Sequence, residues 1–543
     1  MKLKRTFCLI IVFNFYFTLT LSAQDELQLL ATMTGEKTGD MFSVVAGVGD
    51  VNGDGYDDVL ASTLMGNYAK LYFGGSPFDT LADLKFVGEQ SSRFGCSTTA
   101  ADVNSDGFND IIIGASHYCI GGFYGIIDAG KVYIYLGGTN MDTTADLTIL
   151  PKSDPYEPYR YHFGYSVAGA GDVNGDGYDD IIIGAPNDIY YGKAYIFYGD
   201  SIMDDQADVF IKEGELQDML GWSVDCAGDV NGDGFDDVIV GIPQDFNGGS
   251  GKAQLYLGGN PMDNVADAIF QGGDNPYNSF GRVVSGLGDI NNDGFDDFGI
   301  MSLSFIKIIF GNKESANFQK VTINEKSAWG AFESISGGRS IDNDQYSDIL
   351  VSVENREDPI YSGKALLFLG GIKLDTIPDF ELPGMTEHSC FASTIDLLRD
   401  INLDHRDEII IGEHQCWGEY GPGKIYIYTL NYENSIELLK SNKPNNFILY
   451  QNYPNPFNTH TIIRYQLSIK NNIKISIYNI VGKKIKEILN ETQPPGTYKV
   501  FWNGKDQTGN RVQSGIYLCQ IKAKSYSKEN KNSKATIKLI LTK

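Results

Sequence analysis

An acidic nine-residue motif recurs along most of this chain and limits the folds that the chain can adopt. The motif reads Asp-x-Asn-x-Asp-Gly-x-x-Asp, as in "DVNGDGYDD" at 172–180. Five clear copies begin at Asp50, Asp102, Asp172, Asp229 and Asp289, and two eroded copies begin at Ser340 and Asp400. We number them acidic loops one to seven in chain order. They start 51 to 70 residues apart, a period that indicates a propeller, a solenoid or another repeat array.

The segments around each acidic loop also repeat, and they predict four short strands per unit. An aromatic-glycine segment such as "HFGYSVAG" precedes most loops, and an apolar segment such as "DIIIGA" follows them. A third segment such as "GKAYIFYGD" and a fourth that often opens with Ala-Asp complete the unit. Four antiparallel strands make a propeller blade. The predicted fold class is all-β, a seven-bladed β-propeller over 24–430 followed by a small immunoglobulin-like β-sandwich.

The seventh unit supplies three strands before the repeat ends near Leu430. An unassigned strand-like segment, "DELQLLATMTGE", stands at 25–36, ahead of the first unit. We expect this N-terminal strand to complete the last blade, because the pairing would remove exposed strand edges.

The residue types in the acidic loops predict calcium sites. Side chains at positions one, three and five of a tight turn converge on one point, while the position-seven carbonyl and the position-nine carboxylate add further oxygens. Calcium takes 6–8 oxygen ligands, and the absence of Cys and His disfavours zinc. Magnesium fits less well because it prefers rigid octahedral sites that keep several waters. The alternative is an Asx-rich surface turn without metal. The predicted ligands are Asp50, Asn52, Asp54, Tyr56, Asp58, Asp102, Asn104, Asp106, Phe108, Asp110, Asp172, Asn174, Asp176, Tyr178, Asp180, Asp229, Asn231, Asp233, Phe235, Asp237, Asp289, Asn291, Asp293, Phe295 and Asp297.

These loops differ from an EF-hand, whose twelfth position is a bidentate Glu and whose flanks are helices. Position twelve of acidic loop three is Ile183, and the flanks read as strands. The two eroded loops, 340–348 and 400–408, are left open as metal sites. Ser340 replaces the first Asp in one, and Glu408 the last Asp in the other. The sequence thus predicts about five calcium ions, with one or two more at the eroded loops.

The stretch "FGYSVAGAGDVNGDGYDDIIIGAP" resembles the FG-GAP repeats of the integrin α-subunit propeller, and the resemblance covers about 25–430. It implies calcium loops on one face of the propeller and ligand recognition on the other.

The two ends of the chain predict an exported protein. Lys2, Lys4 and Arg5 precede an apolar run and a small-residue cleavage site, which indicates a signal peptide over 1–23. The alternative is a membrane anchor, but the run is shorter than the ~20 residues that a span needs. After signal removal we expect no transmembrane segment.

The tail differs in composition from the repeat region. Residues 445–543 carry 16 Lys and Arg against 4 Asp and Glu, whereas the rest carries 27 against 66. So acidic a repeat region disfavours nucleic acid as a partner. After a linker at 431–446, the order "NYPNPFN", "IYNIVGKKI", "WNGKDQTGNRVQSGIY" over 447–543 is similar to the C-terminal sorting domain of the type IX secretion system. That resemblance implies the type IX machinery as a partner, with secretion to the outside or outer surface of a Gram-negative bacterium. The alternative is an immunoglobulin-like binding module.

The cysteines suggest two disulfides, because export permits them. Cys96 and Cys119 bracket one hairpin-like unit, and Cys390 and Cys416 bracket another. The alternative is isolated buried thiols, which suits Cys226. Whether either disulfide forms is left open by the sequence.

The sequence favours a binding or adhesion module over an enzyme. It contains no Gly-x-Ser-x-Gly elbow, phosphate loop or His-Glu-x-x-His motif. His117, His162, His388 and His414 stand near strand ends away from the acidic loops, and no two of them form a recognisable metal pair by spacing. The alternatives are a secreted polysaccharide- or phosphoester-cleaving enzyme on the same scaffold and a purely structural surface-layer protein.

Aromatic residues gather in the connections at the other end of the hairpins, and they predict a face for an unknown extracellular protein or glycan. Packing of these rings against the blade ends is the alternative. The residues are Tyr156, Tyr159, Tyr190, Tyr191, Tyr277, Trp417 and Tyr420.

Overall fold

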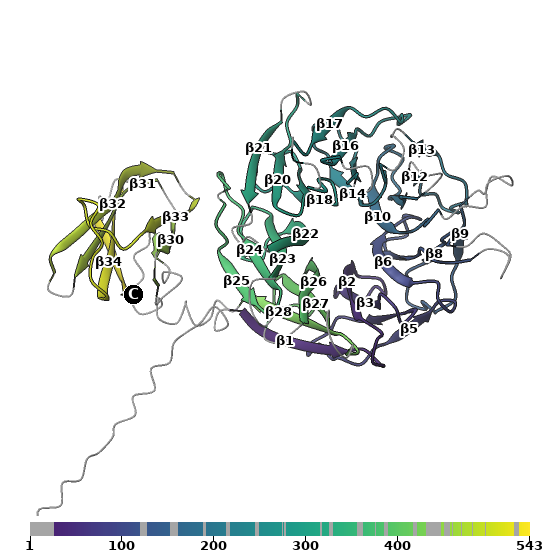
Figure 1. Ribbon diagram of the computed structural model, residues 1–543, viewed down its shortest axis with the longest axis horizontal. Coiled ribbons are helices and arrows are strands. Elements are labelled where there is room, and N and C mark those ends of the chain that lie inside the picture. The colour runs from purple at the N-terminus through teal and green to yellow at the C-terminus, as the bar shows by residue number, and fades with distance from the viewer. Residues whose placement is uncertain are drawn as a thin grey trace, which may run out of the picture.

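Seven four-stranded antiparallel sheets stand in a ring in the computed structural model, and a sandwich of a three-stranded and a four-stranded sheet follows them (Figure 1). The described residues form strands and turns without helices. The structure describes residues 27–542 except 120–127, 152–160, 188–191, 213–217, 245–248, 274, 276–277, 315–317, 325–329, 356–361, 375, 385–388, 416–420, 431–446, 450–456, 459, 468–469, 480–481, 495 and 526–531.

Blades one to three each use four consecutive strands, which pair in chain order. Blade one contains β2 (Phe42–Gly49), β3 (Asp58–Thr63), β4 (Tyr68–Tyr72) and β5 (Leu84–Val87). Blade two contains β6 (Phe94–Ala101), β7 (Asp110–Ala115), β8 (Val132–Tyr135) and β9 (Leu147–Ile149). Blade three contains β10 (Ser166–Gly171), β11 (Asp180–Ala185), β12 (Lys193–Phe197) and β13 (Val209–Ile211).

Blades four to six repeat this arrangement. Blade four contains β14 (Val224–Gly228), β15 (Asp237–Ile242), β16 (Lys252–Tyr256) and β17 (Ala268–Gln271). Blade five contains β18 (Val283–Gly288), β19 (Asp297–Met301), β20 (Phe305–Phe310) and β21 (Gln319–Asn324). Blade six contains β22 (Gly330–Arg339), β23 (Asp348–Asn355), β24 (Lys364–Phe368) and β25 (Phe380–Pro383).

The seventh blade joins the two ends of the repeat region, as the sequence predicts. It contains β26 (Ser389–Leu398), β27 (Glu408–Gln415) and β28 (Lys424–Leu430), and its outer strand is β1 (Leu27–Thr34). β1 runs antiparallel to β28, with Leu27 opposite Leu430 and Thr34 opposite Lys424. In Figure 1 the purple β1 lies beside the green β28. The predicted closure of the ring is therefore confirmed.

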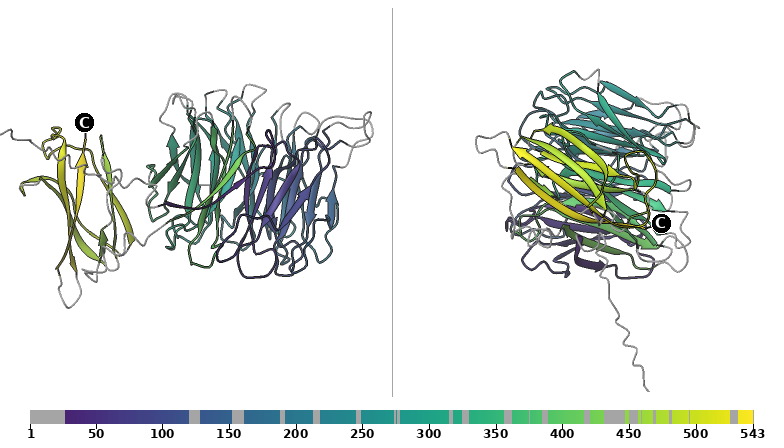
Figure 2. Two further views of the ribbon diagram at one scale, coloured as in Figure 1. Left: turned by 90° about the horizontal axis from the view of Figure 1, so that it is seen from below. Right: turned by 90° about the vertical axis from the view of Figure 1, so that its left-hand side faces the viewer.

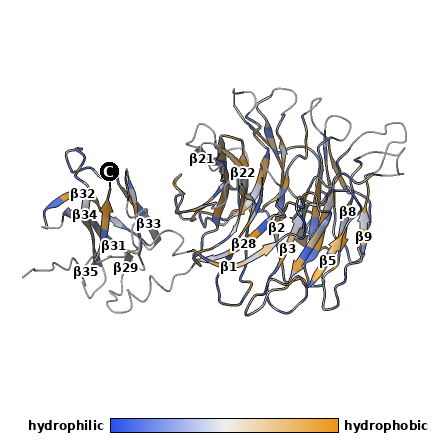
Figure 3. Ribbon diagram, turned by 60° about the horizontal axis from the view of Figure 1, so that its bottom comes forward, coloured by the Kyte–Doolittle hydropathy of each residue, from blue (hydrophilic) through white to orange (hydrophobic). Residues whose placement is uncertain are grey.

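The core lies between adjacent blades rather than inside one sheet. Every residue of β11 is buried, because blade two covers one face of this strand and blade four the other. Ile182 packs with Val224 and Val238 of blade four, whereas Ile181 packs with Ile112 of blade two. Figure 3 shows hydrophobic stretches along the strands of the ring. This two-sided burial explains why the second strand of each unit is a continuous apolar run.

Glycine sets the distance between neighbouring blades. A Cβ built at Gly184 of β11 would lie 2.0 Å from the carbonyl oxygen of Gly221, which belongs to the Leu-Gly segment that opens blade four. The same contact joins Gly114 to Gly164, at 2.2 Å. Two backbones meet here at a distance that no side chain allows, and this accounts for the glycines in both the "FG" and the "GAP" segments.

The C-terminal region forms two packed sheets. One contains β29 (Phe447–Leu449), β30 (Thr461–Leu467) and β33 (Gly496–Trp502). The other contains β31 (Asn471–Asn479), β32 (Lys484–Gln493), β34 (Gly515–Ser525) and β35 (Asn532–Leu541). Trp502 and Tyr465 are fully buried between the sheets. Figure 2 shows the sandwich beside the ring, where Lys499 Nζ lies 3.1 Å from Asp379 Oδ2. The predicted fold class is confirmed for both regions.

The structure bears differently on the two suggested disulfides. Cys390 is disulfide-bonded, and its expected partner Cys416 lies outside the described residues. The Cys96–Cys119 disulfide is wrong, because both side chains are free thiols. Cys96 Sγ instead lies 3.4 Å from the Ser116 hydroxyl, and burial raises the pKa of the Cys96 thiol.

Substitutions at two positions of β1 test whether this strand closes the propeller. Met33 is 2% exposed and packs between blades seven and one, whereas Leu29 is 48% exposed. We expect Met33→Ala to lower the free energy of unfolding by about 2–5 kcal/mol, since it leaves a core cavity. Leu29→Ala should stay within about 0.5 kcal/mol. Denaturant melts at one fixed calcium concentration measure both, and equal melts for the two variants would contradict the role of β1.

Candidate metal-binding loops

Acidic loop three joins β10 to β11, and its carboxylates hold its own backbone in a closed turn. Asp172 Oδ1 accepts the N–H groups of Gly175 and Asp176 at 2.7 and 3.0 Å. Its Oδ2 accepts the N–H of Gly177 at 2.9 Å, and Gly177 has a φ of +93°. Asn174 Oδ1 accepts the Asp176 N–H at 2.8 Å. Positions one, three and five therefore gather their oxygens around one turn, and the glycine at position six supplies the positive φ that the turn adopts.

Asp180, at position nine, lies at the base of the same loop and is fully buried. Its Oδ2 accepts the Val173 N–H at 2.9 Å, and its Oδ1 accepts the Gly199 N–H at 2.8 Å. The carboxylate thus joins the loop to the end of β12. Burial, with a smaller contribution from the charges of Asp176 and Asp172, raises the pKa of Asp180 to about 7.

The other four clear loops repeat this geometry. In each, the position-one carboxylate accepts N–H groups of the turn, and the position-nine carboxylate is fully buried. Burial raises the pKa of Asp58 and Asp110 to about 7 and that of Asp237 and Asp297 to about 8. Each loop therefore has a buried carboxylate at its base, whose charged form burial disfavours, and further oxygen donors in the turn above it.

Acidic loop seven brings its carboxylates closest together, although its sequence departs from the motif. One oxygen from each of Asp400, Asp404 and Glu408 lies within 4.8 Å of the others. Among the described residues, no other acidic loop gathers three carboxylates this closely. Glu408 is fully buried; its Oε2 accepts the Ile401 N–H at 3.2 Å. The extra methylene of Glu, compared with Asp, extends this carboxylate further into the loop.

The second oxygen of Glu408 provides a direct test of fit for a cation. Glu408 Oε1 is buried and has no hydrogen-bond partner among the described residues. Burial, with a smaller contribution from the charges of Asp404 and Asp400, raises the pKa of Glu408 to about 9. A buried carboxylate oxygen without a donor is costly, and a hard cation is a ligand that would satisfy it. The residues of this loop therefore fit a divalent ion bound by oxygen.

Acidic loop six has a different donor set at positions one and three. The Ser340 hydroxyl takes the place of the first carboxylate and accepts the Asp344 N–H at 2.9 Å. Asp348 keeps the buried position-nine geometry, and burial raises its pKa well above the usual range. Asp342 stands at position three, where the clear loops have Asn, so the four side-chain positions of the motif still carry three carboxylates.

A residue that the sequence reasoning missed joins neighbouring loops. Asp236, at position eight of loop four, accepts the Asp172 N–H of loop three through Oδ2 at 2.9 Å. The Asp236 N–H in turn donates to the Asp172 carbonyl at 3.2 Å. Asp179 and Asp296 make the same contact with the preceding loops. The doubled Asp-Asp at positions eight and nine was the signal: one carboxylate serves its own loop, and the other serves the preceding loop.

The aromatic residue at position seven has a second role besides its carbonyl. A Cβ at Gly175 of loop three would lie 2.5 Å from Cε1 of Phe235, which belongs to loop four. Gly53 and Phe108 make the same contact at 2.3 Å. In loops two and four the aromatic side chain therefore covers the turn of the preceding loop. Backbone hydrogen bonds such as that from the Ser347 N–H to the Asp289 carbonyl link further neighbouring loops into a layer.

At the other end of the blades, the seven aromatic residues predicted to contact a ligand all lie outside the described residues, as does His388. The rings of His117 and His162 stack with centroids 4.7 Å apart, although they belong to different blades. His414 Nδ1 lies 3.2 Å from the Ser43 hydroxyl. Spacing along the sequence therefore did not reveal that His117 and His162 lie side by side.

Comparisons with known proteins agree with this geometry. The FG-GAP repeat family matches residues 163–197 and 221–256, which cover much of blades three and four. The FlgD Ig-like domain family matches residues 463–527 of the C-terminal sandwich.

The chain also resembles curated proteins in part of its length. It is 33% identical to integrin alpha-5 of Xenopus laevis over 212 residues, which is 37% of this chain and 20% of that protein. It is 32% identical to integrin alpha pat-2 of Caenorhabditis elegans over 245 residues, 40% of this chain and 19% of that protein. The phosphatidylinositol-glycan-specific phospholipase D of Bos taurus is 32% identical over 181 residues, 31% of this chain and 21% of that protein.

The chain spans about a fifth of the length of these relatives. It contains an integrin-like β-propeller built from FG-GAP repeats. Within the described residues, no helix is long and apolar enough to cross a membrane.

The raised carboxyl pKa values predict an unusual pH dependence for the metal-free protein. Between about pH 4 and pH 7, the folded state keeps protons that the unfolded state has lost, because the pKa of Asp180 rises from 3.8 to about 7 on folding. The free energy of unfolding therefore falls as pH rises through this window. We expect the melting temperature in chelator to fall from pH 5 to pH 8, and Asp180→Asn to weaken this slope. A melting temperature that rises over the same range would contradict the assignment.

Proposed function

We propose that this chain is a secreted or cell-surface β-propeller that calcium stabilises and that binds an extracellular protein or glycan. The observation that carries the calcium assignment is the repeated oxygen set of the acidic loops, together with the buried orphan oxygen of Glu408. The similarity to integrin α chains supports an adhesion role. The 25 predicted ligands of loops one to five remain candidates for about five calcium ions, and loop seven is a further candidate.

Calcium fits these loops better than the other common divalent ions. The donors are carboxylate, amide and carbonyl oxygens, which suit hard cations rather than zinc. A turn of nine residues with donors at five positions suits the flexible geometry of calcium better than the strict octahedron of magnesium. Bound calcium would also offset the charge that burial disfavours at Asp180 and its equivalents.

The face opposite the acidic loops is the proposed ligand face. The strands of each blade run between two ends, and the connections gather at those ends (Figure 2). Because the acidic loops occupy one end and are joined into a continuous layer, the other end is left for recognition. Its predicted aromatic residues suit sugar rings or protein loops.

The basic C-terminal sandwich is proposed to direct export. The order of its motifs supports a sorting role, with the type IX secretion machinery as partner and a Gram-negative outer surface as destination. The match to an Ig-like domain family is compatible both with this role and with a separate binding module.

A phosphoester-cleaving enzyme is the second candidate. The similarity to a phosphatidylinositol-glycan-specific phospholipase D favours it, but that match covers 21% of the phospholipase. A product assay with phosphoester and polysaccharide substrates, run beside a glycan array, separates the two functions. Binding without turnover supports the adhesion module.

Calcium removal tests the structural part of the proposal. We expect EDTA to lower the melting temperature and calcium to restore it better than magnesium. A site held at 100 times its dissociation constant contributes about 2.7 kcal/mol. Asp176→Ala should reduce the calcium effect, while Asp205→Ala, an exposed carboxylate outside the acidic loops, should leave it unchanged. An unchanged melt in chelator would exclude calcium as a stabilising ligand.

Ligand binding tests the assignment of the faces. With a partner from a glycan array or surface screen, Tyr190→Ala combined with Tyr191→Ala should weaken binding while leaving the melt nearly unchanged. Asp176→Ala should lower stability first and affect binding only through unfolding. If folded Asp176→Ala protein loses binding while the tyrosine variant binds normally, the two faces are assigned the wrong way round.

A further inference from the structure

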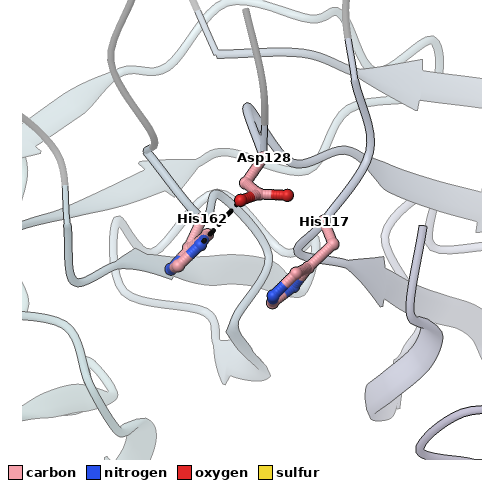
Figure 4. A group of neighbouring side chains, drawn as sticks. All are labelled: His117, Asp128 and His162. Atoms are coloured by element: carbon pink, nitrogen blue, oxygen red, sulfur yellow. Dashed lines mark ion pairs between the residues drawn. The ribbon is translucent and has the colours of Figure 1, made fainter. Parts of the chain in front are cut away.

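Two histidines and an aspartate meet where blades two and three adjoin, and no step of the proposed function uses them (Figure 4). β7 begins at acidic loop two and runs away from it, so His117, two residues past Ala115, lies at the opposite end of the blade. Asp128 precedes β8, and His162 precedes β10. We propose that His117, Asp128 and His162 bind a divalent transition-metal ion of the zinc class.

The ligand atoms are already close together. One atom from each of the three side chains lies within 4.8 Å of the others, and His162 Nε2 is 3.8 Å from Asp128 Oδ2. Tetrahedral zinc with bonds of 2.0–2.1 Å holds its ligand atoms roughly 3.4 Å apart. The atoms must therefore close by up to about 1.4 Å. The stacked rings must also turn out of their near-parallel arrangement, in which the planes differ by 14°.

The backbone holds the three residues in place across two blades. The His162 N–H donates to the Asp128 carbonyl at 3.0 Å, and the Phe163 N–H donates to the Ala129 carbonyl at 3.1 Å. Asp128 and His162 have φ angles of +54° and +52°, which residues other than glycine rarely adopt. Such strain persists where surrounding contacts fix the conformation, and it is often found at functional sites.

Each imidazole has a polar neighbour at the nitrogen that a metal would leave unused. His117 Nδ1 lies 3.0 Å from the Ser116 hydroxyl, and His162 Nδ1 lies 2.7 Å from the Asn187 side-chain amide. Metal-bound histidines usually donate their second N–H to such a partner, which fixes the ring orientation. Rotation of the Asn187 amide by half a turn would present its oxygen as that acceptor.

The donor set separates this site from the acidic loops. Two imidazole nitrogens and one carboxylate suit zinc, copper or nickel rather than calcium. The side chains of His162 and Asp128 are each 14% exposed, so an ion can reach them while solvent occupies the remaining coordination position. Three protein ligands with one open position are typical of zinc sites that bind a further ligand.

Equilibrium dialysis of the full chain tests the site. The protein is stripped of metal and then titrated with zinc in excess calcium, so that the acidic loops are filled. We expect His117→Gln and His162→Asn each to remove one bound zinc ion or to lower the affinity for it more than about 100-fold. The loss of a hydrogen-bond partner of a metal-bound histidine alone lowers metal affinity about 10–100-fold. His460→Gln is the matched control outside the site and should bind as wild type does. Equal zinc binding in all four proteins would overturn the proposal.

Cobalt distinguishes a lost ligand from a lost fold. Low-coordinate cobalt with nitrogen ligands absorbs visible light strongly, so wild type should develop bands that His162→Asn lacks. Asn tolerates the positive φ at position 162, so the His162→Asn variant should keep the blade folded. A thermal melt of the variant in calcium checks that it is folded. A wild-type protein without cobalt bands, or variants that keep them, would show that the rings and the carboxylate form only a stacked pair and an ion pair.

Discussion

The carboxylate that ends each acidic loop connects separate pieces of backbone from a buried position, and the rest of the architecture depends on it. Asp180 accepts one N–H from its own loop and another from the end of β12. Two backbone donors partly offset the cost of burying a charge, and a bound cation would offset the remainder. The stability of a blade and the occupancy of its loop are therefore expected to be linked.

Adjacent blades are joined at both ends of their strands by different chemistry. At the acidic end, Asp236 and Phe235 reach the preceding loop, so each loop is completed by its neighbour. At the other end, the close backbone contact of Gly184 with Gly221 leaves no room for side chains. Because both sets of contacts run from blade to blade, a disturbance in one loop is expected to reach its neighbours before it reaches the opposite face.

The features that could be predicted from sequence are those that depend on residues of a single repeat. Seven copies of a four-strand pattern identify the ring, and the missing strand of the last copy identifies β1. Positions one, three and five of loop three gather as expected because a turn of nine residues leaves few alternatives. The contact of Asp236 with Asp172 joins residues of different repeats, and so does the stacking of His117 on His162. The sequence left the Cys96–Cys119 disulfide open, and it is absent because the Cys96 thiol packs against Ser116 instead of reaching Cys119.

The pairing of β1 with β28 also has a consequence for the order of folding. Leu27 lies opposite Leu430, so the first strand of the ring pairs with a strand that is synthesised about 400 residues later. Contacts so distant in sequence form slowly, because the entropy of closing the intervening chain is lost before the contact is gained. Until β28 has emerged, β1 has no partner strand, and until β1 docks, β28 presents an open edge. The pairing of β1 with β28 is therefore expected to be the last step in closing the propeller. Until that step, the edges of both strands must be protected from other partners.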